Sequence, residues 1–251
     1  MRLDSAKQMH DNYVQTVETG AAPAANEYLK HFGKFTVAGL FLDRRLTSLN
    51  PVQAINCHAD LPADDQHSLV LSDYAKKALW DEAVRSFRFA VWPDQTQGTF
   101  LTLRVSEPDT IPTDEQLRSS TMMRAYRAIS EEGDGFKAYV TICLALLLGR
   151  RPVCIIDEPE MCLHPPQARN LGQLIARSSA SAKTVTLVAT HNSHILRGVL
   201  ETREPLTILR LERRRKQFGA HVVPIGILRE VVIKPTVRAE SISTALQLWS
   251  R

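Results

Sequence analysis

The most informative shortage in this chain of 251 residues is glycine, of which there are only 11. None of them belongs to the pattern G-x-x-x-x-G-K-[ST], the loop whose backbone N–H groups cradle phosphates. The sole Gly-Lys pair, Gly33-Lys34, is followed by Phe35 and has no earlier glycine at the required spacing. The sequence as given therefore contains no phosphate loop of this kind.

Long apolar runs and a strong charge bias are also missing. The longest apolar stretch, Ala138–Gly149, falls far short of the roughly 18 residues that a membrane span needs. Residues 1–19 mix acidic with basic side chains and lack an apolar segment, which excludes a signal peptide or an acid-poor transit peptide. With 31 Lys and Arg against 27 Asp and Glu, the net charge of +4 does not by itself predict nucleic-acid binding.

The four cysteines show no metal-ligand spacing with histidines, and Cys143 and Cys154 lie in apolar runs. We therefore expect reduced thiols and a cytoplasmic protein that makes no membrane contact. A hydrophobic content of 44% with 23% charged residues is typical of a globular chain and excludes a disordered one.

The first half of the chain predicts mixed α and β structure. A strand is expected over 35–42, ending in the charged turn Asp43–Arg45. Apolar residues at helical spacing predict a helix over 72–92, and alternation predicts a strand over 98–105. The predicted organisation is a loosely attached leader (1–34), a strand and helix segment (35–121), a core (122–235) and a C-terminal tail (236–251).

The second half alternates apolar strands with helices, which predicts an α/β core with a mainly parallel sheet flanked by helices. Strands are expected over 153–156, 184–189 and 206–211, and helices over 136–148, 167–178 and from Ser193 onward. Because the first two of these strands are continuous apolar runs, we expect them to be buried on both faces.

Two adjacent carboxylates, Asp157 and Glu158, follow the strand at 153–156 directly. Ligands of open parallel sheets bind beyond the carboxyl ends of the strands, so both side chains are placed at a candidate site. In a nucleotide hydrolase, Asp157 would hold Mg²⁺ and Glu158 would orient or deprotonate the attacking water. The Asp-Glu-Pro sequence is equally compatible with a solvated turn.

A glycine-flanked acid stands at the start of the apolar helix, in the run Gly133-Asp134-Gly135-Phe136-Lys137. Free backbone N–H groups and the helix dipole favour an anion at such a position. Taken alone, the run also suits an ordinary turn in which Asp134 caps the helix. It lies one helix and one strand before Asp157.

His191 follows the next apolar strand, in Thr190-His191-Asn192-Ser193, and is expected at the same sheet edge as Glu158. A neutral imidazole there could contact a γ-phosphate and the attacking water, although a capping or core histidine is the alternative. His194 is expected to belong to the following helix.

A basic stretch, Arg203–Lys216, has six positive and two negative residues and is expected at the tip of a hairpin. Contact with DNA phosphates is one interpretation. The absence of interleaved aromatic residues favours a solvated turn instead.

Together the three motifs resemble the ABC-type ATPases. Gly133–Ala138 resembles a degenerate signature loop, Ile155–Glu160 a Walker B strand and Thr190–Ser193 a switch loop, with Leu163-His164-Pro165 in the D-loop position. The combination is similar to the AAA-21-like or OLD (overcoming lysogenization defect) family, relatives of the RecF and SMC ATPases. The resemblance is specific over 133–211 and weaker from Phe35 onward.

The resemblance implies a P-loop NTPase-like fold and a nucleotide-dependent dimer that hydrolyses ATP with Mg²⁺ in DNA-related or phage-defence work. One subunit would offer Glu158 and His191 as catalytic residues and Asp157 as metal ligand. The other would bind the nucleotide through Gly133, Asp134, Gly135 and Lys137. A DNA or nuclease effector is an implied partner.

The sequence departs from the family pattern in three respects. Gly133 stands where the family usually has serine, no room remains before Arg251 for the Toprim nuclease domain that often follows, and the Walker A phosphate loop is absent. We therefore interpret the chain as the C-terminal lobe of such an ATPase, which is either a fragment, a decayed copy or one part of a split enzyme. The alternative is a non-catalytic or split-ATPase interaction module, whose partner chain carries Walker A.

Overall fold

The computed structural model of the chain describes only part of its length. The predicted leader, apart from Gln15, and the predicted tail lie outside this part, and the boundaries of the four predicted segments stay a prediction. The described residues are 15, 37–50, 52–53, 73–94, 96, 100–110, 113, 115–147, 151–182, 184–214, 217–226 and 228–229.

A three-stranded parallel sheet forms the centre of the fold. Its strands are β1 (Val37–Leu40), β6 (Val153–Asp157) and β7 (Val185–Ala189), in the order β1-β6-β7. Helix α8 (Asp134–Leu147) precedes β6, and α9 (Pro165–Ala182) makes the crossover from β6 to β7. The predicted α/β class with a parallel sheet is confirmed.

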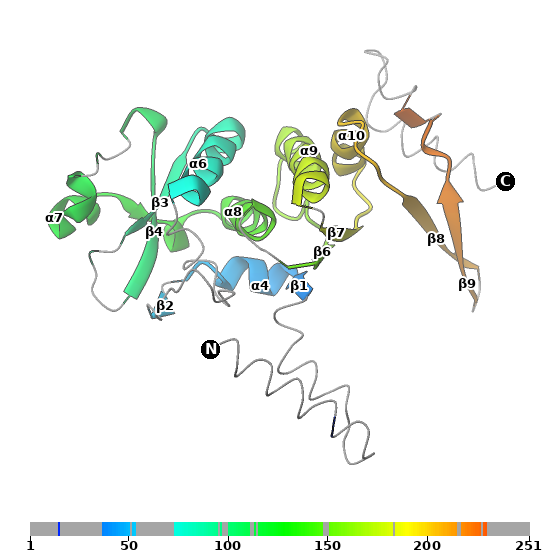
Figure 1. Cartoon of the computed structure of the whole chain (residues 1–251), viewed down its shortest axis with the longest axis horizontal. Coiled ribbons are helices and arrows are strands. Elements are labelled where there is room, and N and C mark those ends of the chain that lie inside the picture. The colour runs from blue at the N-terminus through cyan, green and yellow to red at the C-terminus, as the bar shows by residue number, and fades with distance from the viewer. Residues whose placement is uncertain are drawn as a thin grey trace.

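The main core lies between this sheet and the helices on one side of it (Figure 1). Every residue of α8 from Ala138 to Leu146 is buried, as its largely apolar sequence predicts. In β6 burial alternates, so that Cys154 and Ile156 face the helices. Such alternation is the pattern of a strand that is covered on one face.

Burial of the strands on both faces was a wrong expectation. In β7, Val185 and Leu187 remain 58% and 54% exposed, although both are large apolar residues. The reason is that, among the described residues, the helices α8, α9 and α10 (Ser193–Glu201) all lie on the other side of the sheet (Figure 1). The described helices therefore leave the apolar face of β7 that carries Val185 and Leu187 exposed.

A second, antiparallel sheet accompanies helix α6 (Asp73–Phe87). The predicted strand at 98–105 is confirmed as β4, but the helix predicted over 72–92 ends at Phe87. Arg88 has a φ of 59°, and this left-handed residue turns the chain into a strand that buries Val91 and Trp92. The strands of this sheet are β2 (Val52–Gln53), β3 (Ala90–Asp94), β4 (Phe100–Ser106) and β5 (Arg127–Ala128), with β4 between β2 and β3 and also paired with β5.

The charged turn expected at Asp43–Arg45 is instead part of a helix, α4 (Leu42–Thr47). Arg45 is fully buried there, whereas Arg44 is exposed. The expected hairpin around the basic stretch is confirmed as β8 (Ile208–Arg214) and β9 (Gln217–Val223). The remaining short elements are η2 (Pro108–Thr110), η3 (Gln116–Arg118), α7 (Ser120–Met123) and η4 (Ile129–Glu131).

Two glycines allow α9 and α10 to pack closely. A Cβ added to Gly198 would lie 2.0 Å from the carbonyl oxygen of Arg169, and one added to Gly172 would lie 2.4 Å from that of Ile195. Both distances are far below contact, so these positions require glycine. The packing holds α10, and with it the loop that precedes α10, against the crossover helix.

A buried ion pair predicts how stability depends on pH. Burial raises the pKa of Asp94, but hydrogen bonds from Thr96 and Arg104 outweigh it and hold the pKa below its usual range. The stabilisation is therefore present above the unfolded-state pKa of about 3.9 and is lost as the pH falls through the lower folded-state value. Asp94→Asn should lower the free energy of unfolding at pH 7 by about 3 kcal/mol, because Arg104 would stay buried without its partner.

Urea unfolding at pH 7 and at pH 3 measures this effect. The control is Asp81→Asn, which removes the exposed pair between Asp81 and Lys77 and should cost less than about 1 kcal/mol. Equal effects of the two substitutions would contradict the role given to Asp94.

Among the described residues, no helix combines the length and the apolar character needed to cross a bilayer.

Candidate functional site

The turn after β6 carries three acidic side chains in different environments. Asp157 ends the strand and is exposed, Glu158 is half-buried, and Glu160 is buried. Glu158 has a φ of 44°, a left-handed conformation that is unfavourable for a residue with a Cβ. Its N–H donates to the carbonyl of Ala189 at 2.8 Å, and its carbonyl accepts from Met161 at 3.1 Å. The strained residue is therefore tied to the end of β7.

The turn after β7 is held by side-chain hydrogen bonds. Asn192 caps α10, since its side chain accepts from the backbone of His194 at 2.8 Å and of Ile195 at 3.4 Å. Thr190 donates through its hydroxyl to Glu160 Oε1 at 2.7 Å. His194 lies in the helix, as expected. These bonds fix the backbone on both sides of His191.

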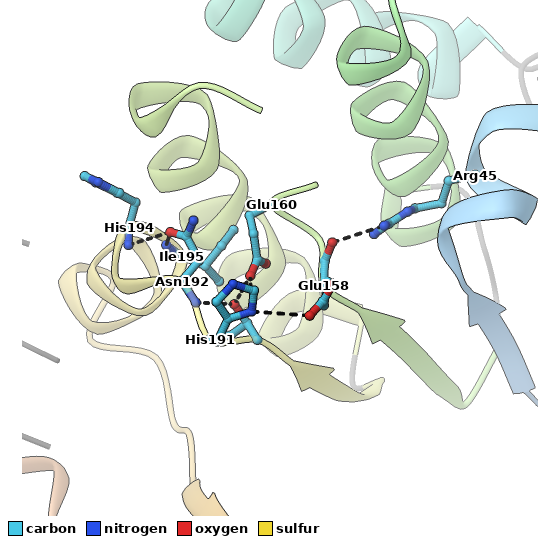
Figure 2. A network of polar contacts seen from close by, with 8 residues as sticks. Arg45, Glu158, Glu160, His191, Asn192, His194 and Ile195 are labelled. Carbon is cyan, nitrogen blue, oxygen red and sulfur yellow. Dashed lines mark hydrogen bonds and ion pairs between the residues drawn. The ribbon is translucent and has the colours of Figure 1, made fainter. Parts of the chain in front are cut away.

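The two turns bring Glu158 and His191 together, as the sequence predicted. His191 Nδ1 lies 3.3 Å from Glu158 Oε1 and 3.7 Å from Glu160 Oε1 (Figure 2). The side chains of His191 and Glu158 are 76% and 46% exposed, so both are accessible to a ligand at this edge. A carboxylate and an imidazole at hydrogen-bond distance, open to solvent, can accept and pass on a proton.

Arg45 is a site residue that sequence reasoning missed. It extends from α4 toward the turn after β6 on the side opposite to His191, and its Nη2 donates to the carbonyl of Glu158 at 3.1 Å (Figure 2). Burial lowers the pKa of Arg45, while the nearby charges of Asp157 and Glu160 act against this shift. The sequence held no signal for this contact, because a charged triplet after a strand is typical of an exposed turn.

The glycine run at the start of α8 is divided between two environments. Gly133 and Asp134 are exposed, and a Cβ added to Gly133 would meet nothing within 4 Å. A Cβ added to Gly135 would lie 2.2 Å from the carbonyl oxygen of Cys162, in the turn after β6. Lys137 forms an ion pair with Asp134 at 2.8 Å. The run therefore packs beside the Asp157–Cys162 turn and presents its first two residues outward.

The donor atoms at this edge suit Mg²⁺, which prefers oxygen ligands and is held by one or two carboxylates together with substrate phosphates. Asp157 and Glu158 provide carboxylates at the end of β6, and Glu160 Oε2 is buried without a hydrogen-bond partner among the described residues. Within the same residues, no group of three or more His, Cys, Asp and Glu side chains could hold a metal alone. The residues fit an ion that also needs phosphate oxygens.

Ligands of open parallel sheets bind beyond the carboxyl ends of the strands, and nucleotide-hydrolysing α/β domains place there the carboxylate that holds Mg²⁺. A family model described as "AAA domain, putative AbiEii toxin, Type IV TA system" matches residues 43–197, and the chain belongs to this AAA domain family. Membership places it among nucleotide-dependent ATPase-type domains. No curated protein matches the chain significantly.

Several solved structures of SMC ATPases are similar to the chain. One, described under "ATP-driven dimerization and DNA stimulated activation of SMC ATPases", is 12% identical with a TM-score of 0.44, over 63% of this chain and 91% of that one. An Smc head bound to the C-terminal winged-helix domain of ScpA is 9% identical with a TM-score of 0.48, over 77% and 57%. An Smc head with coiled coil and joint from Pyrococcus yayanosii is 12% identical with a TM-score of 0.45, over 70% and 29%. The chain thus spans only part of the last two.

Proposed function

We propose that this chain is an ATP-hydrolysing lobe of the OLD-like, ABC-type class, with its reaction at the carboxyl edge of β6 and β7. The observation that carries the proposal is the contact of Glu158 with His191 at 3.3 Å, beside the exposed Asp157. Asp157 would hold Mg²⁺, which would neutralise charge on the phosphates. Glu158 would accept the proton of the attacking water, and His191 would orient that water and the terminal phosphate.

The outward-facing part of the glycine run supports a dimeric arrangement. Gly133 and Asp134 are exposed, and a Cβ added to Gly133 would meet no atom within 4 Å, so a second molecule can approach both residues. In this proposal they bind, with Lys137, the nucleotide held by the opposite subunit. Gly135 would support this loop by its packing against the turn after β6.

A second candidate function is an interaction module that works only with a partner chain supplying the phosphate loop. Two observations favour it. The 251 residues contain no G-x-x-x-x-G-K-[ST] pattern, and the described helices leave Val185 and Leu187 exposed on one face of β7. Parallel sheets are usually covered on both faces, so a partner element packed on this face would complete the domain.

Titration of ATP and Mg²⁺ into the purified chain, followed by calorimetry, distinguishes the two candidates. The first predicts binding by the chain alone that weakens with Asp157→Asn. The second predicts no binding until a partner with a phosphate loop is added. Tight binding that is insensitive to Asp157→Asn would contradict both, because the nucleotide would then bind elsewhere.

We also propose a cellular location and partners for this ATPase. The resemblance of the sequence motifs supports a cytoplasmic ATPase in DNA-related or phage-defence work, and the family description adds only an AAA domain and a "putative AbiEii toxin". Contact with DNA or with a nuclease effector would involve the basic hairpin of β8 and β9, where Arg213 and Arg214 stand at the end of β8. In the same strand Arg210 forms an ion pair with Glu212 at 3.0 Å.

A further inference from the structure

Arg45 is buried in a way that packing alone does not explain. Its side chain is completely inaccessible to solvent, and its Nε and Nη1 atoms have no hydrogen-bond partner among the described residues. Burying a charged group is costly unless it is paired, and an apolar side chain of similar size would avoid that cost. A buried arginine here therefore calls for an explanation in terms of what it contacts.

The contact that Arg45 makes is with the backbone of Glu158. The Glu158 carbonyl accepts from Arg45 Nη2 at 3.1 Å and from the Met161 N–H at 3.1 Å. Glu158 has the left-handed φ of 44°, which a non-glycine residue keeps only when its surroundings hold it. The guanidinium therefore supports a strained peptide at the point where the carboxylate faces His191 (Figure 2).

Arg45 is itself held firmly from the other side. Thr141, which is fully buried in α8, donates through its hydroxyl to the Arg45 carbonyl at 2.9 Å. The same hydroxyl lies 3.0 Å from the hydroxyl of Ser48. These bonds fix α4 on the core helix α8. Hydrogen bonds therefore connect α8 to α4, and α4 to the turn that carries Glu158.

We propose that Arg45 is a positioning residue for Glu158: it holds the left-handed turn so that the carboxylate stays directed at His191. The inference rests on the proposed function for its catalytic meaning, because it is there that Glu158 accepts a proton. The geometry that it concerns, the turn and the His191 contact, exists without nucleotide and can be measured without it.

The test compares Arg45→Met, which keeps the stem and removes every donor, with Arg44→Met, which changes the exposed neighbour in the same helix. Hydrogen exchange of the backbone N–H groups at 158–163, of which Pro159 has none, is one readout. In Arg45→Met we expect these amides to exchange about tenfold faster, while those of β8 and β9 stay unchanged, because a hydrogen bond from a charged group is lost. Arg44→Met should match the wild type.

The second readout is the set of imidazole resonances of His191 at one fixed pH. Glu158→Gln changes the group that faces His191 and so defines the direction of the shift. Arg45→Met should move the resonances in that same direction, and Arg45→Lys, which keeps one donor group and the charge, should restore them in part. A residue that only fills space would not be rescued by lysine.

Unchanged exchange at 158–163 and unchanged His191 resonances in a folded Arg45→Met protein would overturn the proposal. If Arg45→Met does not fold, Arg45→Lys decides: faster exchange confined to 158–163 supports positioning, and an increase spread over α8 and β6 refutes it. Failure of nucleotide binding or turnover would count against the proposed function and leave both readouts intact.

Discussion

Glu158→Gln is expected to lower ATP turnover at least about 100-fold, the usual contribution of a positioned general base. Glutamine has nearly the same shape and can still contact His191, but its amide cannot accept the proton of the attacking water. The effect should therefore fall on the rate of the chemical step, with nucleotide binding retained. Steady-state phosphate release and calorimetric binding, measured on the same preparation, separate the two.

The control for this substitution is Glu131→Gln, an exposed glutamate in η4, which should leave turnover unchanged. Wild-type turnover that Glu158→Gln does not affect would remove the catalytic role of Glu158. If the wild-type chain shows no turnover by itself, the result favours the second candidate function, and the comparison is then made in the presence of a partner that carries a phosphate loop.

Gly135→Ala is expected to destabilise the protein by about 1–3 kcal/mol, the range seen for overpacking in a tight interior. The added Cβ would lie 2.2 Å from the Cys162 carbonyl oxygen, which belongs to the backbone and cannot rotate away. Either α8 or the turn after β6 must shift. Because this turn also carries Glu158, we expect turnover to fall together with the midpoint of urea unfolding.

Gly133→Ala is the matched control, two residues earlier in the same run. Its Cβ would meet no atom within 4 Å, so the free energy of unfolding should change by less than about 0.5 kcal/mol. Similar losses of stability in both variants would show that the run does not pack as described. Chemical unfolding followed by tryptophan fluorescence provides the measurement.

The sequence predicts those parts of the site whose positions depend on where the strands end. An apolar run that stops at Asp157 and another that stops before His191 predict two parallel strands, and neighbouring parallel strands bring the residues after their carboxyl ends to one edge. The approach of Glu158 to His191 results from that rule. The assignment of catalytic, metal and nucleotide contacts to these residues stays a prediction.

Other features depend on tertiary contacts that periodicity does not contain. The helix that ends at Phe87 carries apolar spacing onward to Val91, but Val91 and Trp92 are better buried in a strand. In β7 the exposed residues Val185 and Leu187 are apolar, as they would be in a strand whose two faces are both covered. The sequence pattern does not reveal the role of Arg45, because its partner, the carbonyl of Glu158, is a backbone atom far away in sequence.

In the proposed function, the nucleotide binds at the carboxyl edge of β6 and β7. An ATP titration that is followed residue by residue with NMR tests this location most directly. Using Mn²⁺ in place of Mg²⁺ broadens the resonances of nearby residues, even when binding is weak. We expect broadening at 157–162 and 190–194 and none in the β8–β9 hairpin. Broadening confined to other parts of the chain, or no broadening at this edge with a phosphate-loop partner present, would contradict a nucleotide site at this edge.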